Sequence, residues 1–443
     1  MVQKASAVIH QLADNRKEMV GFCRYINNPK VELNSLMEEN QLACKNNLSK
    51  EESYLVLHDT SDLNFMNHSG KLRIRDKDIG PIGQKDTKGV GFMLHPSLVV
   101  NSVTGFPKGF SNIKLWNREF GQKDRLERSY KKQPIEDKES YKWLEGIYSS
   151  RWLCENSAHI THVMDRESDF YDLFIQPRAK NEDWIVRVCQ DRCLMDEELN
   201  LKAYLSEQPI RCSFKLKIKG NEHRKKRTAK LGLKYDKIKI KKPTNKSKDL
   251  SPFVEVNVVV IEEYASSVPE GEEPIRWILY TTHEIQSIAD ALQIVEWYRM
   301  RWIIEELFAT LKTRGLCIED SQLETGIGLK KLTVIALQAA LHILQLVKER
   351  DNKNGEKASL IFSSKAVIFL KALVKTLEGK TEKQKNPYPE DSLAWAAWCI
   401  GRLGGWKGYK SESPPGPRTM KRGLTKFWHS FDGWSLAFNF DST

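Results

Sequence analysis

The sequence lacks the long apolar run that a membrane-spanning helix needs. No stretch of roughly eighteen consecutive apolar residues occurs, so the pattern predicts no bilayer span. The N-terminus, MVQKASAVIHQLADNRKEM, alternates apolar and polar residues without an apolar core, and we therefore expect no secretory signal peptide. Both absences favour a cytosolic protein.

Cysteine is sparse and scattered. Among the 8 cysteines only Cys189 and Cys193 lie close together. A C-x3-C pair without a second pair nearby is a weak zinc signal. We expect reduced thiols in a cytosolic protein rather than a disulfide framework.

Positive charge, by contrast, is in excess. The chain has 70 Lys and Arg against 58 Asp and Glu, a net charge of +12, and a pI near 9.1. This balance favours a polyanionic partner, although composition alone does not separate nucleic acid from an acidic membrane. With 443 residues, 40% of them hydrophobic, the chain is long enough for two or three globular domains.

The basic residues gather in one stretch. Residues 215–248 hold fifteen Lys or Arg against Glu222 and Asp236, a net of +13. The segments KLKIKG, KYDKIKIKKP, VEVNVVVIEE and IRWILYTT alternate with period two, which predicts a β-rich insert with one basic face. We expect this face to bind nucleic acid; an ordinary solvated face is the alternative.

Two apolar strands are predicted to end in acids. Residues 54–58 precede Asp59, and residues 160–164 precede Asp165. Further strands are expected at 92–103, 109–117 and 184–188, with helices at 142–154, 166–174 and 329–347. A Gly-rich break is expected at 80–91 and an exposed polar connection at 118–140. In open α/β sheets function gathers at strand ends. Because acids commonly flank strands, each acid alone is weak evidence.

Residues 287–314 predict one long helix. Ser287 is a good N-cap, no Pro interrupts the segment, and Gly315 stands where a C′ glycine belongs. At about 100° per residue, Tyr298, Arg301, Glu305 and Lys312 share a stripe about 60° wide. One carboxylate among three groups that bind phosphate is typical of phosphoryl transfer.

Asp59, Asp165 and Glu305 together suit a divalent-metal site. Phosphodiester chemistry is helped by two ions about 3.5–4 Å apart, and hard ions such as Mg²⁺ prefer oxygen ligands. We therefore expect the three acids to hold Mg²⁺ or Mn²⁺, as two ions. The basic and phenolic groups of the stripe would bind the flanking phosphates.

The Y-x2-R-x3-E-x6-K spacing from Tyr298 to Lys312 resembles the signature of the bacterial DD(E) cut-and-paste transposases of the IS-four group, of Tn-five type. The segments LHDTSDL, IGPIGQKDTKGVGF, VMDRESD and RLGG resemble the same family in the same order, over nearly the whole chain. The resemblance implies a DNA transposase with Asp59, Asp165 and Glu305 as its catalytic and metal-binding triad. Members of the family cut both strands at transposon ends through a DNA hairpin and join the ends to target DNA.

The resemblance also implies an α/β architecture. An RNase H-like mixed-sheet core, residues 51–190 and 286–348, would be interrupted by the basic β-rich insert, residues 191–285. A helical DNA-binding region, residues 1–50, would precede the core, and a helical dimerisation region, residues 349–443, would follow it. The partners implied are double-stranded DNA, at transposon ends and target, and a second copy when DNA-bound, in the bacterial cytosol near the nucleoid.

Three further DNA contacts follow from the resemblance. On pattern alone Trp277 is by default a core residue, with base stacking or flipping as the alternative. The family makes it the tryptophan that takes the place of a flipped base. Arg187 matches an arginine near the hairpin phosphates, and Arg24 falls in the end-binding region.

The chain departs from the family at two places. It starts late, lacking most of the first helical segment that reads the transposon end, and Cys189 stands where the family has a basic residue near the hairpin. The late start leaves open a shortened DNA-binding form that inhibits the full-length enzyme. An RNase H-like nuclease is the other alternative, since it needs the three acids but neither the tryptophan nor the stripe.

Overall fold

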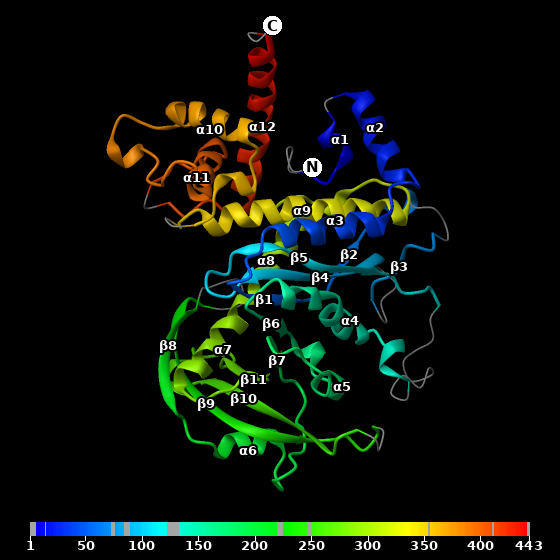
Figure 1. The fold of residues 1–443 in the computed structure, drawn as a ribbon, viewed down its shortest axis with the longest axis vertical. Helices are drawn as coiled ribbons and strands as arrows, with labels where there is room; N and C mark the ends of the chain where they lie inside the picture. The colour runs from blue at the N-terminus through cyan, green and yellow to red at the C-terminus, as the bar shows by residue number, and fades with distance from the viewer. Residues whose placement is uncertain are drawn as a thin grey trace.

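One mixed sheet runs through the computed structural model, which describes residues 6–13, 15–71, 76–83, 89–121, 133–218, 225–246, 250–352, 355–409 and 412–440. The described residues form an 11-stranded sheet with the order β2-β4-β1-β6-β7-β11-β10-β9-β8, and β3 and β5 also pair with β4. Helices cover this sheet and extend beyond it (Figure 1). The protein is therefore of the mixed α/β class that the sequence predicts.

Three parallel strands make the centre of the sheet. β1 (Ser53–His58), β6 (His159–Met164) and β7 (Glu182–Arg187) lie side by side. Their side chains are almost all buried, as apolar runs in a parallel sheet predict. Since Leu57 pairs with Val163, the residues that follow β1 and β6 leave the sheet at the same edge.

An antiparallel meander flanks β1. It contains β2 (Ser61–Asn64), β3 (Gly80–Pro81), β4 (Val90–Asn101) and β5 (Pro107–Trp116). The strands expected at 92–103 and 109–117 are thus confirmed within a few residues. The short strand β2, which pairs with β4, was not predicted. The expected Gly-rich break at 80–91 and the connection at 118–140 lie partly outside the described residues.

The basic insert extends this same sheet. Its strands are β8 (Cys212–Ile218), β9 (Arg227–Lys241), β10 (Phe253–Glu263) and β11 (Arg276–Thr281), with α6 (Leu201–Glu207) before them. β11 pairs antiparallel with β7. Leu279 of β11 therefore lies opposite Arg187, the last residue of β7.

The helix expected at 287–314 is divided. The structure has α7 (Ile288–Met300) and α8 (Trp302–Leu311), so the prediction of one uninterrupted helix is wrong. At the division the Arg301 N–H donates to the Tyr298 carbonyl, and the Ile304 N–H donates to the Arg301 carbonyl. These bonds span three residues instead of four and tighten the turn. The predicted Ser287 cap is present as a capping box with Asp290.

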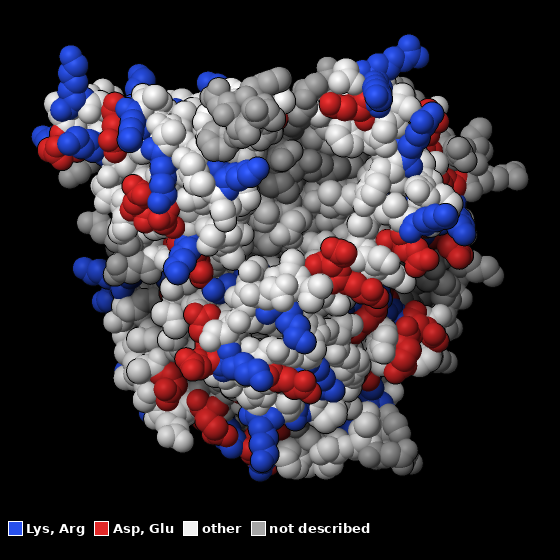
Figure 2. Space-filling view, turned by 45° about the horizontal axis from the view of Figure 1, so that its top comes forward, with Lys and Arg blue, Asp and Glu red and all other residues white. Residues whose placement is uncertain are grey.

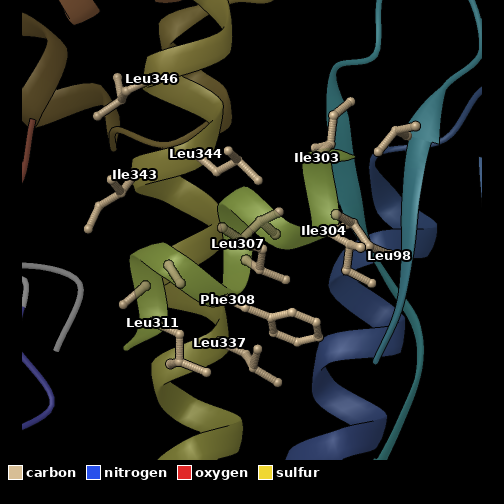
Figure 3. Close-up of a cluster of buried hydrophobic side chains, with 14 of the residues drawn as sticks. Leu98, Ile303, Ile304, Leu307, Phe308, Leu311, Leu337, Ile343, Leu344 and Leu346 are labelled. Carbon is tan, nitrogen blue, oxygen red and sulfur yellow. The ribbon is translucent and has the colours of Figure 1, made fainter. Parts of the chain in front are cut away.

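The apolar helix α9 (Gly326–Glu349) is the centre of the helical layer. In Figure 3, Leu307, Phe308 and Leu311 of α8 lie against α9, and Ile304 of α8 lies near Leu98 of β4. α9 has the length and composition of a membrane span, but 78% of its apolar window is buried inside the protein. It is therefore a core helix, as the pattern at 329–347 predicts.

The terminal helices lie on the side of α9 away from the sheet, apart from α3 (Figure 1). The N-terminal ones are α1 (Ile9–Leu12), α2 (Arg16–Asn27) and α3 (Leu33–Asn46), and α3 packs on β5. The C-terminal ones are α10 (Ser364–Leu377), α11 (Leu393–Leu403) and α12 (Pro417–Phe440). Phe427 and Trp428 of α12 are buried against Phe362, so much of the C-terminal aromatic content packs within the chain.

The helix expected at 166–174 is also divided. After α4 (Tyr141–Ser150), which was predicted, the chain forms the 3-10 turn η5 (Arg166–Ser168) and the short α5 (Tyr171–Phe174). Between them the Asp169 carboxylate turns inward and accepts from the backbone N–H groups of Cys189 and Gln190.

Other 3-10 turns are η1 (Met66–Lys71), η3 (Ile135–Asp137), η4 (Arg151–Glu155), η6 (Ala265–Ser267), η7 (Ile318–Asp320), η8 (Ala358–Leu360) and η9 (Glu382–Gln384).

Candidate active site

Two acids leave the sheet at one edge. Asp59 follows the last residue of β1, and Asp165 follows the last residue of the neighbouring parallel strand β6. Neighbouring strands lie about 4.8 Å apart, so this placement brings the two carboxylates close together. Backbone N–H groups hold one oxygen of each: Thr60 donates to Asp59 Oδ1 at 2.8 Å, and Glu167 donates to Asp165 Oδ1 at 2.8 Å.

Arg301 links Asp59 to the helix that carries Glu305. Its Nη1 donates to Asp59 Oδ2 at 2.6 Å, and its Nη2 donates to Glu305 Oε1 at 3.2 Å. The Arg301 and Asp59 side chains are only 14% and 12% exposed. Because little water screens this contact, the pair is electrostatically strong. The tight turn at Arg301 places this guanidinium between the two carboxylates.

Negative charge at the edge exceeds what Arg301 neutralises. Burial raises the pKa of Asp59 to about 7; Arg301 opposes the rise, and the charges of Asp165 and Glu305 add to it. Burial also raises the pKa of Asp165, against the Glu167 N–H bond that lowers it. Crowded, partly desolvated carboxylates of this kind gain stability when a cation enters.

An aromatic cluster with one cation borders the acids. Trp277, on β11, packs edge to face on Tyr298 with ring centroids 5.2 Å apart. The Arg187 guanidinium, at the end of β7, lies 5.5 Å from the Trp277 ring and 5.8 Å from the Tyr298 ring. Arg187 also donates to the Arg276 carbonyl at 2.6 Å. Trp277 is half-buried, and Tyr298 is 8% exposed beneath the cluster.

Lys312 directly follows α8 and lies beside β2, the short strand that comes after Asp59. Its Nζ donates to the Asp62 carbonyl at 2.9 Å and lies 3.2 Å from Glu319 Oε1. Glu319 also accepts from the Asn64 N–H at 2.8 Å. Lys312 thus ties the end of α8 to β2. Sequence reasoning missed Asp62 and Glu319; the second acid of the D-T-S-D segment was the available signal.

Residues 160–341 match the family model of the transposase DDE domain. The match includes Asp165, Glu305 and the whole of α7 and α8, and Asp59 lies before it. The DDE domain is an enzyme domain that catalyses phosphoryl transfer, so the chain is an enzyme, and the match implies DNA binding and DNA transposase activity. The mixed sheet with its parallel centre is consistent with the RNase H-like core of a DDE domain.

DDE transposases use divalent metal ions, and the carboxylate edge suits them. The possible ligands of Asp59, Asp165 and Glu305 are all oxygens, which hard cations prefer. They come from separate segments: Arg301 contacts both Asp59 and Glu305, and the charges of Asp165 and Glu305 both act on Asp59. Burial is the main cause of the raised pKa of Asp59, and the negative charges of Asp165 and Glu305 add to the rise.

A buried histidine pair lies behind the acids: His58 is one residue before Asp59, and His162 is three residues before Asp165. His58 Nε2 is 2.9 Å from His162 Nδ1, and His162 Nε2 is 3.2 Å from Glu182 Oε1. Burial holds the pKa of His58 well below its ordinary value, so its ring is neutral. This chain fastens β1 to β6 directly beneath Asp59. Sequence reasoning missed it, because a histidine on an apolar strand gives no distinct signal.

Two of the residues singled out from the sequence lie outside the group formed by the carboxylate edge and the aromatic cluster. Arg24 is exposed on α2, a helix that packs against α9. Cys189 is exposed, and its thiol lies 3.3 Å from the Arg166 carbonyl. The structure therefore groups Arg187, Trp277 and Tyr298 with the carboxylate edge of the DDE domain, and places Arg24 on the helical layer.

The basic insert carries less free charge than its sequence suggests. Within the described part of the basic stretch 215–248, acids pair with five basic side chains: Arg227, Lys234, Lys237, Lys239 and Lys246. Four of these acids belong to the insert itself, and Asp172 precedes it. Lys215, Lys217 and Lys230 are exposed, and Lys215 lies opposite Lys230 in the β8–β9 register. The predicted basic face is therefore narrowed to the exposed lysines of β8 and β9. On the face that Figure 2 shows, basic and acidic side chains are likewise interspersed.

Proposed function

We propose that this protein is a cut-and-paste DNA transposase of the IS-four group in which Asp59, Asp165 and Glu305 are the catalytic residues. The observation that carries the proposal is that Asp59 and Asp165 leave neighbouring strands at one sheet edge while Arg301 joins Asp59 to Glu305, with the pKa of Asp59 raised to about 7. Arg301 is one cation in contact with two of the three acids, and such an excess of negative charge is costly unless it serves to bind a cation. The three acids would hold two Mg²⁺ or Mn²⁺ ions.

The chemistry is attack of an oxygen nucleophile on a DNA phosphodiester. Water first cuts one strand and leaves a free 3′-hydroxyl. That hydroxyl attacks the opposite strand, which forms the hairpin and releases the flanking DNA. A second water then opens the hairpin and restores the 3′-hydroxyl, which attacks target DNA. When bound, a pair of divalent ions supplies activation of the attacking oxygen and stabilisation of the leaving oxygen. Asp59, Asp165 and Glu305 position that charge at the edge where the backbone already holds one oxygen of each aspartate.

Arg301 has two roles in this account. In the free protein it neutralises Asp59 and Glu305. A guanidinium also binds phosphate through two parallel N–H bonds. We propose that Arg301 turns from the carboxylates to a DNA phosphate as the cations enter. Lys312, at the end of α8, would contact the next phosphate.

The aromatic cluster is the proposed hairpin site. Trp277 is half-buried, so one part of its ring remains available to replace a base that has left the stack. Tyr298 and Arg187 hold that ring from behind. Arg187 then supplies positive charge for the crowded phosphates of a tight hairpin.

Further DNA contacts are proposed outside the edge. The exposed lysines of β8 and β9, Lys215, Lys217 and Lys230, would bind the DNA backbone, and Arg24 on α2 would contact the transposon end. We place the dimer contact on the outer sides of α10 and α12, where Ile368 is 56% and Leu436 is 63% exposed. The free thiols of all eight cysteines suit a bacterial cytosol.

The joined product distinguishes this proposal from a plain RNase H-like nuclease. DNA fragments ending in the inverted repeats that flank the gene, already cut to a 3′-hydroxyl, are incubated with the full chain, supercoiled plasmid and Mg²⁺ or Mn²⁺. A transposase links fragment to plasmid, whereas a nuclease gives only shorter fragments. Degradation without any joined product would overturn the proposal.

A further inference from the structure

Three metal-ligating side chains meet at the other edge of the sheet. His159 is the first residue of β6, Asp183 is the second of β7, and His283 follows β11 by two residues. One ligand atom from each lies within 4.8 Å of the other two. The strands β6 and β7 separate this cluster from the carboxylate edge by about 17 Å. It is therefore a different site from the one that holds Asp59 and Asp165.

The two histidines of this cluster both face the Oδ2 atom of Asp183. His159 Nε2 lies 3.1 Å from it and His283 Nδ1 lies 3.5 Å from it. His159 Nε2 is shielded from solvent but makes no aligned hydrogen bond. Two imidazole nitrogens thus face one carboxylate oxygen, and the geometry suits a shared cation better than a hydrogen-bond pair. The three side chains are 30%, 13% and 15% exposed, in chain order.

Neighbouring groups hold the ligands in orientation. His283 Nε2 lies 2.8 Å from Thr161 Oγ1, so with Nδ1 free as a ligand the ring donates from Nε2 to that hydroxyl. The other oxygen of Asp183 accepts from Thr282 Oγ1 at 2.7 Å and also contacts Arg178. These contacts leave Oδ2 for a cation. Hydrogen bonds on the far side of each ligand are the usual second layer of a protein metal site.

The charge of the cluster selects the kind of ion. Arg178 balances the single negative charge of Asp183. Imidazole binds metal in its neutral form, and the contact of His283 Nε2 with Thr161 leaves Nδ1 facing Asp183. Two neutral imidazoles and one shared carboxylate suit Zn²⁺, or a similar transition metal, better than Mg²⁺ or Ca²⁺.

We propose that His159, Asp183 and His283 form a second, zinc-class metal site whose role is structural. Zn²⁺ would take these three ligands and a fourth, such as water. The ion would join β6, β7 and the segment that enters α7. That segment matters because the His283 ring lies 5.0 Å from the Trp297 ring of α7, the helix that leads to Arg301 and Glu305. The proposal does not depend on the proposed function.

Zinc titration of the chelator-stripped full chain tests the site. Excess Mg²⁺ is kept present so that the carboxylate edge does not compete for the probe. We expect about one equivalent of Zn²⁺ to bind and to raise the midpoint of thermal unfolding. Co²⁺ in its place should give visible d–d absorption without the thiolate charge-transfer band that cysteine ligands produce.

Four variants separate this site from other sources of binding. His159→Ala and His283→Ala should each lose at least about 100-fold in Zn²⁺ affinity, and Thr161→Val should lose about 10–100-fold as an orienting neighbour. His429→Ala, which removes an exposed histidine of α12, is the matched control and should bind as the parent does. Circular dichroism without metal checks that each variant is folded. A parent that binds no Zn²⁺, or a folded His159→Ala that binds it as tightly as the parent, overturns the proposal.

Discussion

Replacing Asp59 by Asn should stabilise the metal-free protein, and the gain should grow with pH. Burial raises the pKa of Asp59 from 3.8 to about 7. The folded state therefore holds the proton more tightly than the unfolded chain does. Wild-type stability falls as pH rises from the unfolded pKa to the folded one, and the loss is complete above it. Asn carries no charge, so the variant does not suffer this loss.

The expected size follows from the same pKa values. Each pKa unit corresponds to about 1.36 kcal/mol. Between about pH 5.5 and about pH 8 the unfolded chain has already lost the Asp59 proton, whereas the folded protein keeps it up to the folded pKa. Those roughly 1.5 pH units lower the wild-type free energy of unfolding by about 2 kcal/mol. The advantage of Asp59→Asn in the free energy of unfolding should grow by that amount. Loss of the Asp59–Arg301 contact shifts the stability difference between the two proteins by a constant amount, but it adds little pH dependence of its own.

Urea unfolding at the two pH values, with EDTA present, measures this difference. Asp62→Asn is the control, because Asp62 is a nearby carboxylate whose side chain is 46% exposed; its effect should be small and the same at both pH values. Added Mg²⁺ should stabilise the wild type more than Asp59→Asn. A gain for Asp59→Asn that does not change with pH, or a loss at the higher pH, would refute the account of crowded charge.

Three further outcomes are expected. Trp277→Ala should block hairpin formation on transposon-end DNA while sparing the first nick, as resolved on denaturing gels; an unchanged hairpin yield would remove its role. The pair Lys215→Ser and Lys217→Ser should weaken DNA binding and reduce the slope of log affinity against log salt by about 2, since each phosphate contact contributes about 0.9; an unchanged slope would exclude these lysines. Leu307→Ala should cost about 2–5 kcal/mol of unfolding free energy by leaving a cavity between α8 and α9, measured in urea.

The strands and core helices were largely predictable because their burial follows local pattern. Apolar runs gave β1 and β6, and helical spacing gave α9 with nearly the observed bounds. The division at Arg301 was not predictable in this way. Propensity favours continuing the helix there, but the tightened turn accompanies contacts with Asp59, 242 positions away in sequence, and with Glu305.

The candidate sites show the same limit. The four-residue spacing from Tyr298 to Lys312 pointed to phosphoryl chemistry, and strand ends pointed to the two aspartates. Spacing did not reveal that Lys312 is held by Asp62 and Glu319, or that acids of the insert itself, such as Glu263 and Asp196, pair with its basic side chains. Nor did it bring together His159 and His283, since pairing of β6, β7 and β11 is what places them side by side.

Strand joining by carboxylate variants tests the central claim most directly. The full chain joins pre-cut transposon-end DNA to plasmid in Mg²⁺ or Mn²⁺, and Asp59→Asn, Asp165→Asn and Glu305→Gln are compared with it. The control is Glu306→Gln, which changes the adjacent acid of α8, 2.9 Å from Lys348. We expect each of the three variants to abolish joining and the control to retain it. Joining that persists in all three would contradict the assignment of the active site.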